Sequence, residues 1–166
     1  QSVILWVDQA AAMSFTSTDT LPRKATRART LALATAILLL RGGERVGLTG
    51  LRLPPRRGEQ QLARMATALS EDDRTDYGSP DAQGMLPHSR ALFISDFLGD
   101  LEPVQDALTK AADRGVRVRL LLDDNGIGGM DDKLAALDAL ANPWVMGVAG
   151  VAALCEFFAD KVMWLD

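Results

Sequence analysis

The sequence predicts an α/β fold of the doubly wound type, with a mostly parallel sheet and helices on both faces. Short, mainly apolar runs occur at residues 3–7 and 91–95, and such runs are typical of strands buried on both faces; residues 116–122 are predicted to form a further strand. Segments with helical periodicity separate these runs, so right-handed crossovers should make the strands parallel. The 166 residues are enough for one core but few for two. We therefore expect a single α/β domain over residues 1–166.

The first predicted helix follows the first strand. Pro22 suits its first turn, because the N–H that proline lacks would be unpaired there anyway. Residues 23–40 are mostly helix formers, and Gly42 and Gly43 end the pattern. The second half of this helix is apolar nearly all round, so we expect it to be packed on most sides.

A second strand and an amphipathic helix come next. Residues 45–51 have strand character, and Pro54, Pro55 and Gly58 are expected to break the chain after them. Segment 71–89, rich in Asp, Gly, Ser and Pro, is the longest predicted loop and the one we expect to be most mobile. The helix between them is indicated by an apolar stripe at i, i+3, i+4 and i+7, formed by Leu62, Met65, Ala66 and Leu69.

The remaining elements repeat the alternation. Asp100 is placed to cap a helix that Gly115 ends, and the strand at 116–122 follows. Residues 134–141 indicate a short amphipathic helix, and residues 144–166 suggest a strand, a helix and a strand. The core-facing stripe of the helix after Asp100 consists of Leu101, Val104, Leu108 and Ala111.

Composition and charge exclude several classes of function. The formal net charge is -4, and dense basic residues occur only at 23–29 and 56–57, so we expect no nucleic-acid partner. The longest mainly apolar stretch, 31–40, is shorter than the roughly 20 residues that span a bilayer, so no membrane span is expected. Cys155 is the single cysteine and reads as a small buried residue. Because the chain begins at Gln1, without a methionine, we expect a cytoplasmic fragment or the soluble part of an anchored protein.

Aspartates end three of the predicted strands, at Asp8, Asp96 and Asp123. In open parallel sheets ligands bind beyond the carboxyl ends of the strands, near the point where strand order reverses. Two carboxylates brought together there repel each other unless a cation or a shared proton lies between them, which favours a hard metal ion. The other interpretation is that each aspartate caps the helix after its strand. Spacing alone leaves both open.

The first part of the chain carries a recognisable combination of motifs. Residues 5–13 read LWVDQAAAM, and ERVGL, DYGSP and LFISDFLGD follow in that order. Together they resemble a bacterial von Willebrand factor A-like family of unknown function found beside MoxR-type ATPases, over about residues 2–100. In related A domains a metal ion adhesion site starts with Asp-x-Ser-x-Ser after the first strand, and other loops add a threonine and an aspartate. Asp8 matches the first position and Asp96 the last.

The resemblance also implies that this metal site is degenerate. Ala10 and Ala12 occupy the two serine positions, and a methyl group offers no lone pair to Mg²⁺, which requires near-octahedral oxygen coordination. Thr49 and Thr75 are candidates for the missing threonine. We therefore expect Asp8 and Asp96 to bind no metal ion, or Mg²⁺ weakly, and no other cofactor.

A second resemblance covers the last third of the chain. Residues 111–126, AADRGVRVRLLLDDNG, are similar to the phospholipase D-like family, whose catalytic motif is His-x-Lys-x-x-x-x-Asp. Lys161 and Asp166 stand at the matching spacing, but Ala159 takes the place of the histidine that serves as nucleophile in that family. The lone histidine, His88, is read as a solvated loop residue.

These observations favour a non-enzymatic interaction or scaffold domain of the von Willebrand factor A type, with a protein partner and a degenerate metal site. One alternative is an inactive or partner-dependent phosphodiesterase half of the phospholipase D type, in which Lys161 would bind phosphate and Asp166 would orient the site. A second alternative is a chimeric or designed fold without a selected function, because the two resemblances meet near residue 100. The sequence leaves the oligomeric state open.

Overall fold

The doubly wound α/β fold is confirmed by the computed structural model, which describes residues 1–16, 22–51, 53–70, 76–82, 84–122 and 146–149. Its sheet has six strands in the order β3-β2-β1-β4-β5-β6. All neighbouring pairs are parallel except β2 and β3. The strands are β1 (Ser2–Val7), β2 (Arg45–Leu48), β3 (Leu53–Arg56), β4 (Arg90–Ser95), β5 (Arg117–Leu122) and β6 (Met146–Ala149).

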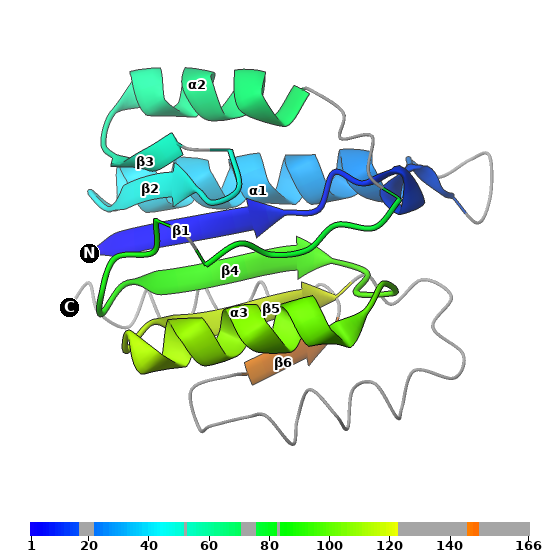
Figure 1. Ribbon diagram of the computed structural model, residues 1–166. Coiled ribbons are helices and arrows are strands. Elements are labelled where there is room, and N and C mark those ends of the chain that lie inside the picture. The colour runs from blue at the N-terminus through cyan, green and yellow to red at the C-terminus, as the bar shows by residue number, and fades with distance from the viewer. Residues whose placement is uncertain (17–21, 52, 71–75, 83, 123–145, 150–166) are drawn as a thin grey trace.

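Helices cover both faces of this sheet (Figure 1). Alternate side chains of a strand point to opposite faces, and β1 is buried along its whole length. Val3, Leu5 and Val7 pack with residues of α1 (Lys24–Arg41) and α2 (Glu59–Ser70) in one cluster. Ile4 and Trp6 pack with α3 (Leu101–Asp113) in the other. The apolar run at residues 3–7 therefore serves two cores at once.

Helix α1 has the predicted position, but its packing is less complete than predicted. It begins at Lys24, directly after Arg23, and its last residue is Arg41. Small alanines face the sheet, whereas Leu38 is exposed although the sequence there is apolar nearly all round. The sheet can cover only one side of a helix, and α2 covers part of another, so the outer face of α1 remains open to solvent.

The apolar stripe of α2 is rotated relative to the prediction. Met65 and Leu69 are fully buried as expected, but Ala66 is exposed. Gln61 is buried instead, and its side-chain amide donates hydrogen bonds to the backbone oxygens of Val46, at 2.8 Å, and Pro54, at 3.0 Å. A polar side chain that satisfies backbone acceptors can thus occupy a core position that hydrophobic periodicity does not reveal.

The predicted chain break at Pro54 and Pro55 is wrong, because both residues lie in strand β3. This strand pairs antiparallel with β2 at the edge of the sheet, where a residue without an N–H is tolerated. Gly47 allows the close approach, since a Cβ at that position would lie 2.6 Å from the Leu53 oxygen. The predicted strand 45–51 is correspondingly shorter and ends at Leu48.

Helix α3 and strand β5 follow the prediction closely. Val104, Leu108 and Ala111 are buried, and Leu101 packs at the edge of the same cluster. Gly115 has a φ of 67°, the left-handed conformation that ends many helices. Asp100 occupies the N-cap position but forms no side-chain capping hydrogen bond, so that detail of the prediction is wrong.

Several predictions fall partly or wholly outside the described residues. Asp123, the helix at 134–141 and Cys155 lie outside them, whereas β6 confirms a strand within 144–166. In segment 71–89, the described residues form neither helix nor strand, and Ala82 and Met85 pack into the α3 cluster. The mobility of that segment stays a prediction. No helix in the described part of the chain has the length and apolar character needed to cross a membrane.

Candidate functional site

Strand order reverses between β1 and β4, and the two aspartates singled out from the sequence flank that point. From β1 the chain continues to β2 on one side, and from β4 it continues to β5 on the other. Val7 pairs with Ile94 in parallel register, and the Asp8 N–H donates to the Ile94 carbonyl oxygen at 2.9 Å. Asp8 and Asp96 therefore leave neighbouring strands at the position where doubly wound sheets bind ligands.

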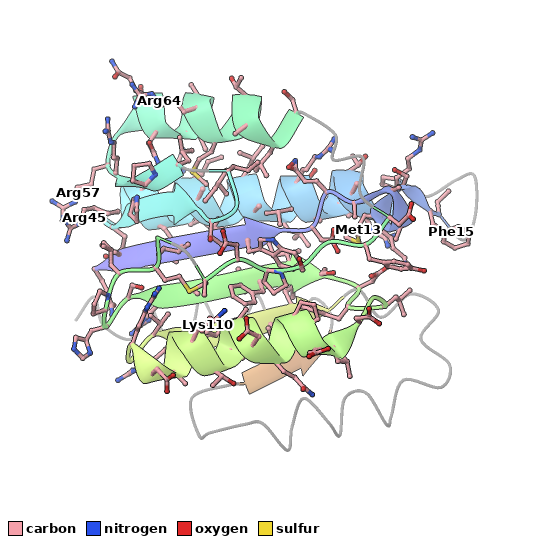
Figure 2. All side chains as sticks on the ribbon, in the orientation of Figure 1. Met13, Phe15, Arg45, Arg57, Arg64 and Lys110 are labelled. Carbon is pink, nitrogen blue, oxygen red and sulfur yellow. The ribbon has the colours of Figure 1, made fainter. Side chains whose placement is uncertain are left out.

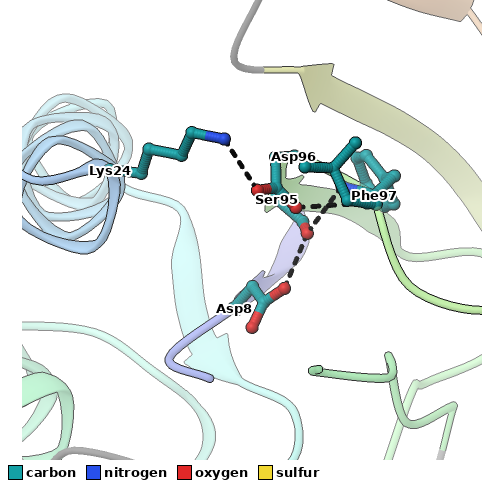
Figure 3. A network of polar contacts seen from close by, with 6 residues as sticks. Asp8, Lys24, Ser95, Asp96 and Phe97 are labelled. Carbon is teal, nitrogen blue, oxygen red and sulfur yellow. Dashed lines mark hydrogen bonds and ion pairs between the residues drawn. The ribbon is translucent and has the colours of Figure 1, made fainter. Parts of the chain in front are cut away.

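Ser95 connects the two strand ends (Figure 3). Its hydroxyl donates to Asp8 Oδ2 at 2.7 Å and accepts from the Phe97 N–H at 3.0 Å. The other oxygen of Asp8 accepts from the Ala10 N–H at 2.9 Å. Both oxygens of a buried carboxylate are thus engaged by donors of the protein itself.

Asp96 is paired with a cation that belongs to the chain. Lys24 Nζ lies 2.9 Å from Asp96 Oδ2, and the two side chains are only 8% and 2% exposed. The second oxygen of Asp96 accepts from the Leu98 N–H at 3.1 Å. Figure 3 shows Lys24 reaching from the start of α1 to the end of β4. We refer to Asp8, Lys24, Ser95 and Asp96 as the carboxyl-end site.

The donor set of the carboxyl-end site does not fit a firmly bound magnesium ion. Ala10 is buried beside Asp8 and supplies only a methyl group where the A-domain motif has a serine. Thr49 donates its hydroxyl to the Asp81 carbonyl oxygen, and Thr75 lies outside the described residues. Within those residues no group of three or more His, Cys, Asp or Glu side chains could hold a metal ion. Weak binding of Mg²⁺ by Asp8 and Asp96 stays a prediction.

The DYGSP segment, residues 76–80, packs against the carboxyl-end site. A Cβ on Gly78 would lie 2.2 Å from Asp8 Oδ1, so only glycine can approach the carboxylate this closely. A Cβ on Gly99 would lie 2.9 Å from the Cβ of Tyr77, which brings the same segment against the loop after β4. The DYGSP motif, which is part of the family resemblance, therefore packs its backbone directly against the Asp8 carboxylate.

Three exposed apolar side chains belong to segments that contact the carboxyl-end site. Phe15 is 62% exposed, Tyr77 58% and Leu98 42%. Each is tied to the site: the Phe15 ring centroid lies 5.9 Å from Lys24 Nζ, Tyr77 precedes Gly78, and the Leu98 N–H binds Asp96. Figure 2 shows Phe15 projecting beyond the end of β1. We call these three residues the apolar rim.

Sequence reasoning identified Asp8 and Asp96 and missed Ser95 and Lys24. Ser95 could have been identified from the sequence, because a hydroxyl residue at the end of a buried strand lies beside the end of the neighbouring parallel strand. Lys24 had no such signal, since it belongs to a basic stretch that opens a helix and is far from Asp96 in sequence. His88 is exposed in a loop, in agreement with the prediction, and Lys161, Asp166 and Ala159 lie outside the described residues.

Most of the chain matches a known protein family. Residues 1–125 match the family model described as protein of unknown function DUF58. The chain belongs to the DUF58 family. This confirms that the first part of the sequence comes from a family of unknown function, and the match reaches beyond the Asp100 boundary of the original resemblance, to the residues after β5.

This DUF58 chain also matches other proteins. Residues 107–166 match a second family model, described as a domain of unknown function (DUF4126). In addition, 33 residues are 67% identical to cardiolipin synthase C of Escherichia coli (strain K12). That match takes in 20% of this chain but only 7% of the relative, so it covers a short segment of a much longer protein.

Proposed function

We propose that the chain is a non-enzymatic interaction or scaffold domain of the von Willebrand factor A type, formed by residues 1–166, with a degenerate metal ion adhesion site. One observation carries the proposal. The polar groups at the strand switch are buried and bind one another, with Asp8 held by Ser95 and Asp96 held by Lys24. A site that performs chemistry keeps reactive groups accessible to a substrate, whereas these groups act as internal supports for the end of the sheet.

The apolar rim supports a protein partner at the same end of the sheet. Phe15, Tyr77 and Leu98 leave large apolar surfaces in water, and the polar network of the site holds the loop that carries Leu98. Aromatic residues contribute much of the binding free energy in protein interfaces. The chain belongs to the DUF58 family. The von Willebrand factor A-like family that its sequence resembles is found beside MoxR-type ATPases, and this is compatible with such a role.

The interaction is tested by replacing the rim without touching the network. In a Phe15→Ser, Tyr77→Ser, Leu98→Ser triple variant we expect loss of the partner that chemical cross-linking captures with the unchanged chain in its host cell. Removing interface anchors typically weakens binding by about 1–4 kcal/mol each. A matched variant, Leu38→Ser with Leu86→Ser, changes exposed leucines elsewhere and should keep the partner. Equal capture by both variants would contradict a rim-mediated interaction.

A second candidate function is favoured by the short match to cardiolipin synthase C. Under it, the chain is an inactive or partner-dependent phosphodiesterase half, with Lys161 and Asp166 as the remaining motif residues. The overlap of the two family models at residues 107–125 supports a third possibility, a recombined chain without a selected function.

Restoring the missing nucleophile separates the first two candidates. On the interaction-domain proposal, Ala159→His should produce no turnover of bis(p-nitrophenyl) phosphate, because a nucleophile without a second motif copy lacks the rest of the catalytic site. The unchanged chain and an Ala159→Gln variant serve as controls in the same assay. Turnover that appears only with histidine would favour the phosphodiesterase half.

A further inference from the structure

Lys24 stands out among the polar residues that the structure describes because its side chain is buried. Lysine is almost never fully buried unless it is paired, and the Lys24 side chain is 8% exposed. By contrast, Lys110, whose ammonium group pairs with Asp106, is 57% exposed. The Lys24 ammonium is therefore held inside the carboxyl-end site rather than resting on the surface.

Its position in α1 makes this arrangement costly for the helix. Lys24 is the first residue of α1, where the N–H groups lack partners within the helix and carry partial positive charge, and the first turn contains no acidic residue. A cation there is disfavoured by local electrostatics. The contact with Asp96, 72 residues away in the sequence, offsets that cost. The lysine is thus explained by the site and not by helix formation.

Phe15 completes the enclosure of the ammonium. The Phe15 ring centroid lies 5.9 Å from Lys24 Nζ, within the range of a cation–π contact. The backbone N–H of Lys24 also donates to the Phe15 carbonyl oxygen at 3.3 Å. The same ring belongs to the apolar rim, so one residue covers the charge and contributes to the exposed surface.

From these contacts we propose that Lys24 is a resident cation. Its ammonium takes the place that a divalent metal ion occupies in a complete metal ion adhesion site, so the fold at the carboxyl end is independent of metal. The inference rests on the proposed degenerate site. It follows that shortening Lys24 leaves Asp96 without its paired positive charge, so that Asp96, together with Asp8 at the end of the neighbouring strand, can bind Mg²⁺ or Mn²⁺, with water filling the remaining coordination positions.

Thermal unfolding of the full chain tests the proposal. Melting temperatures are measured for the unchanged chain, Lys24→Ala and Lys24→Arg, first in EDTA and then in rising MnCl₂ or MgCl₂. We expect the unchanged chain and Lys24→Arg to be insensitive to both metals. Lys24→Ala should melt lower in EDTA and recover by about 5–10 °C when the metal reaches about 100 times its Kd. Lys110→Ala, from the exposed pair, should show neither effect.

Two further variants locate the effect and guard against loss of folding. Lys24→Ala combined with Asp8→Ala should lose the metal response, which would place the ion at the carboxyl-end site. Lys24→Ala combined with Asp96→Asn removes the unpaired negative charge, so it should fold without metal and ignore MnCl₂. If Lys24→Ala alone does not fold in EDTA, folding on addition of MnCl₂ is the expected result.

The proposal is overturned if Lys24→Ala has the melting temperature of the unchanged chain and no metal response. It is also overturned if MnCl₂ stabilises the unchanged chain as strongly as the variant, because the lysine would then not replace the ion. These outcomes are independent of the rim experiment, which measures partner capture. Loss of capture with a metal-insensitive Lys24→Ala variant would retain the interaction domain and reject the resident cation.

Discussion

Asp96→Ala is expected to lower the free energy of unfolding by about 3–5 kcal/mol, the range for breaking a buried ion pair by removing one partner. The ammonium of Lys24 would remain on a side chain that is only 8% exposed, with its carboxylate gone. Asp96 also accepts the Leu98 N–H, so the loop after β4 would lose an anchor in the same variant. The effect should be visible as a lower urea midpoint in equilibrium unfolding.

The matched control is Asp106→Ala. It removes a carboxylate from the Lys110–Asp106 pair, which has the same residue types but side chains that are 57% and 58% exposed. Exposed pairs contribute roughly 0–1 kcal/mol, so this variant should unfold almost like the unchanged chain. If the two aspartate variants lost similar stability, burial of the Lys24–Asp96 pair would not be the cause of its importance.

Phe93→Ala should cost a similar amount for a different reason. Phe93 is fully buried in the central strand β4 and pairs in register with Trp6 of β1 and Leu120 of β5. Its ring meets the Trp6 ring edge-on, with centroids 5.7 Å apart. Truncation of a buried phenylalanine typically costs about 3–5 kcal/mol, because transfer free energy is lost and a cavity remains.

Equilibrium unfolding in urea measures this prediction as well, and Leu86→Ala is its control. Leu86 is an exposed apolar residue, so its truncation should stay within about 0.5 kcal/mol of the unchanged chain. A loss below about 1 kcal/mol for Phe93→Ala would mean that the α3 side of the core can collapse into the cavity. The carboxyl-end site would be expected to survive in that case, because Phe93 is not one of its residues.

The alternation of buried strands and amphipathic helices was predictable because it depends on local patterns. The runs at 3–7 and 91–95 are apolar on both faces, and such segments are stable only between two layers of helix. The edge strand β3 was not predictable, since Pro54 and Pro55 oppose strand formation in the interior of a sheet and the sequence does not show that this segment lies at an edge. The exposure of Ala66 and the burial of Gln61 likewise depend on how α2 rotates against β2.

Some residues of the candidate site were likewise predictable from the sequence, and others were not. Asp8 and Asp96 were visible because each ends an apolar run, and the adjacency of β1 and β4 places them at the strand switch. Ser95 and Lys24 act through contacts that span 87 and 72 positions of sequence, and no periodicity connects positions so far apart. Their roles depend on the fold, which places the start of α1 and the end of β1 beside the end of β4.

From the sequence alone came the layered α/β fold, the two strand-end aspartates and the missing serines of the metal motif, because each is a property of neighbouring residues. The tertiary structure decided which groups compensate those aspartates. A buried carboxylate must find a donor or a cation nearby, and which side chain supplies it depends on the path of the chain through space. Here Ser95 donates to Asp8 and Lys24 pairs with Asp96.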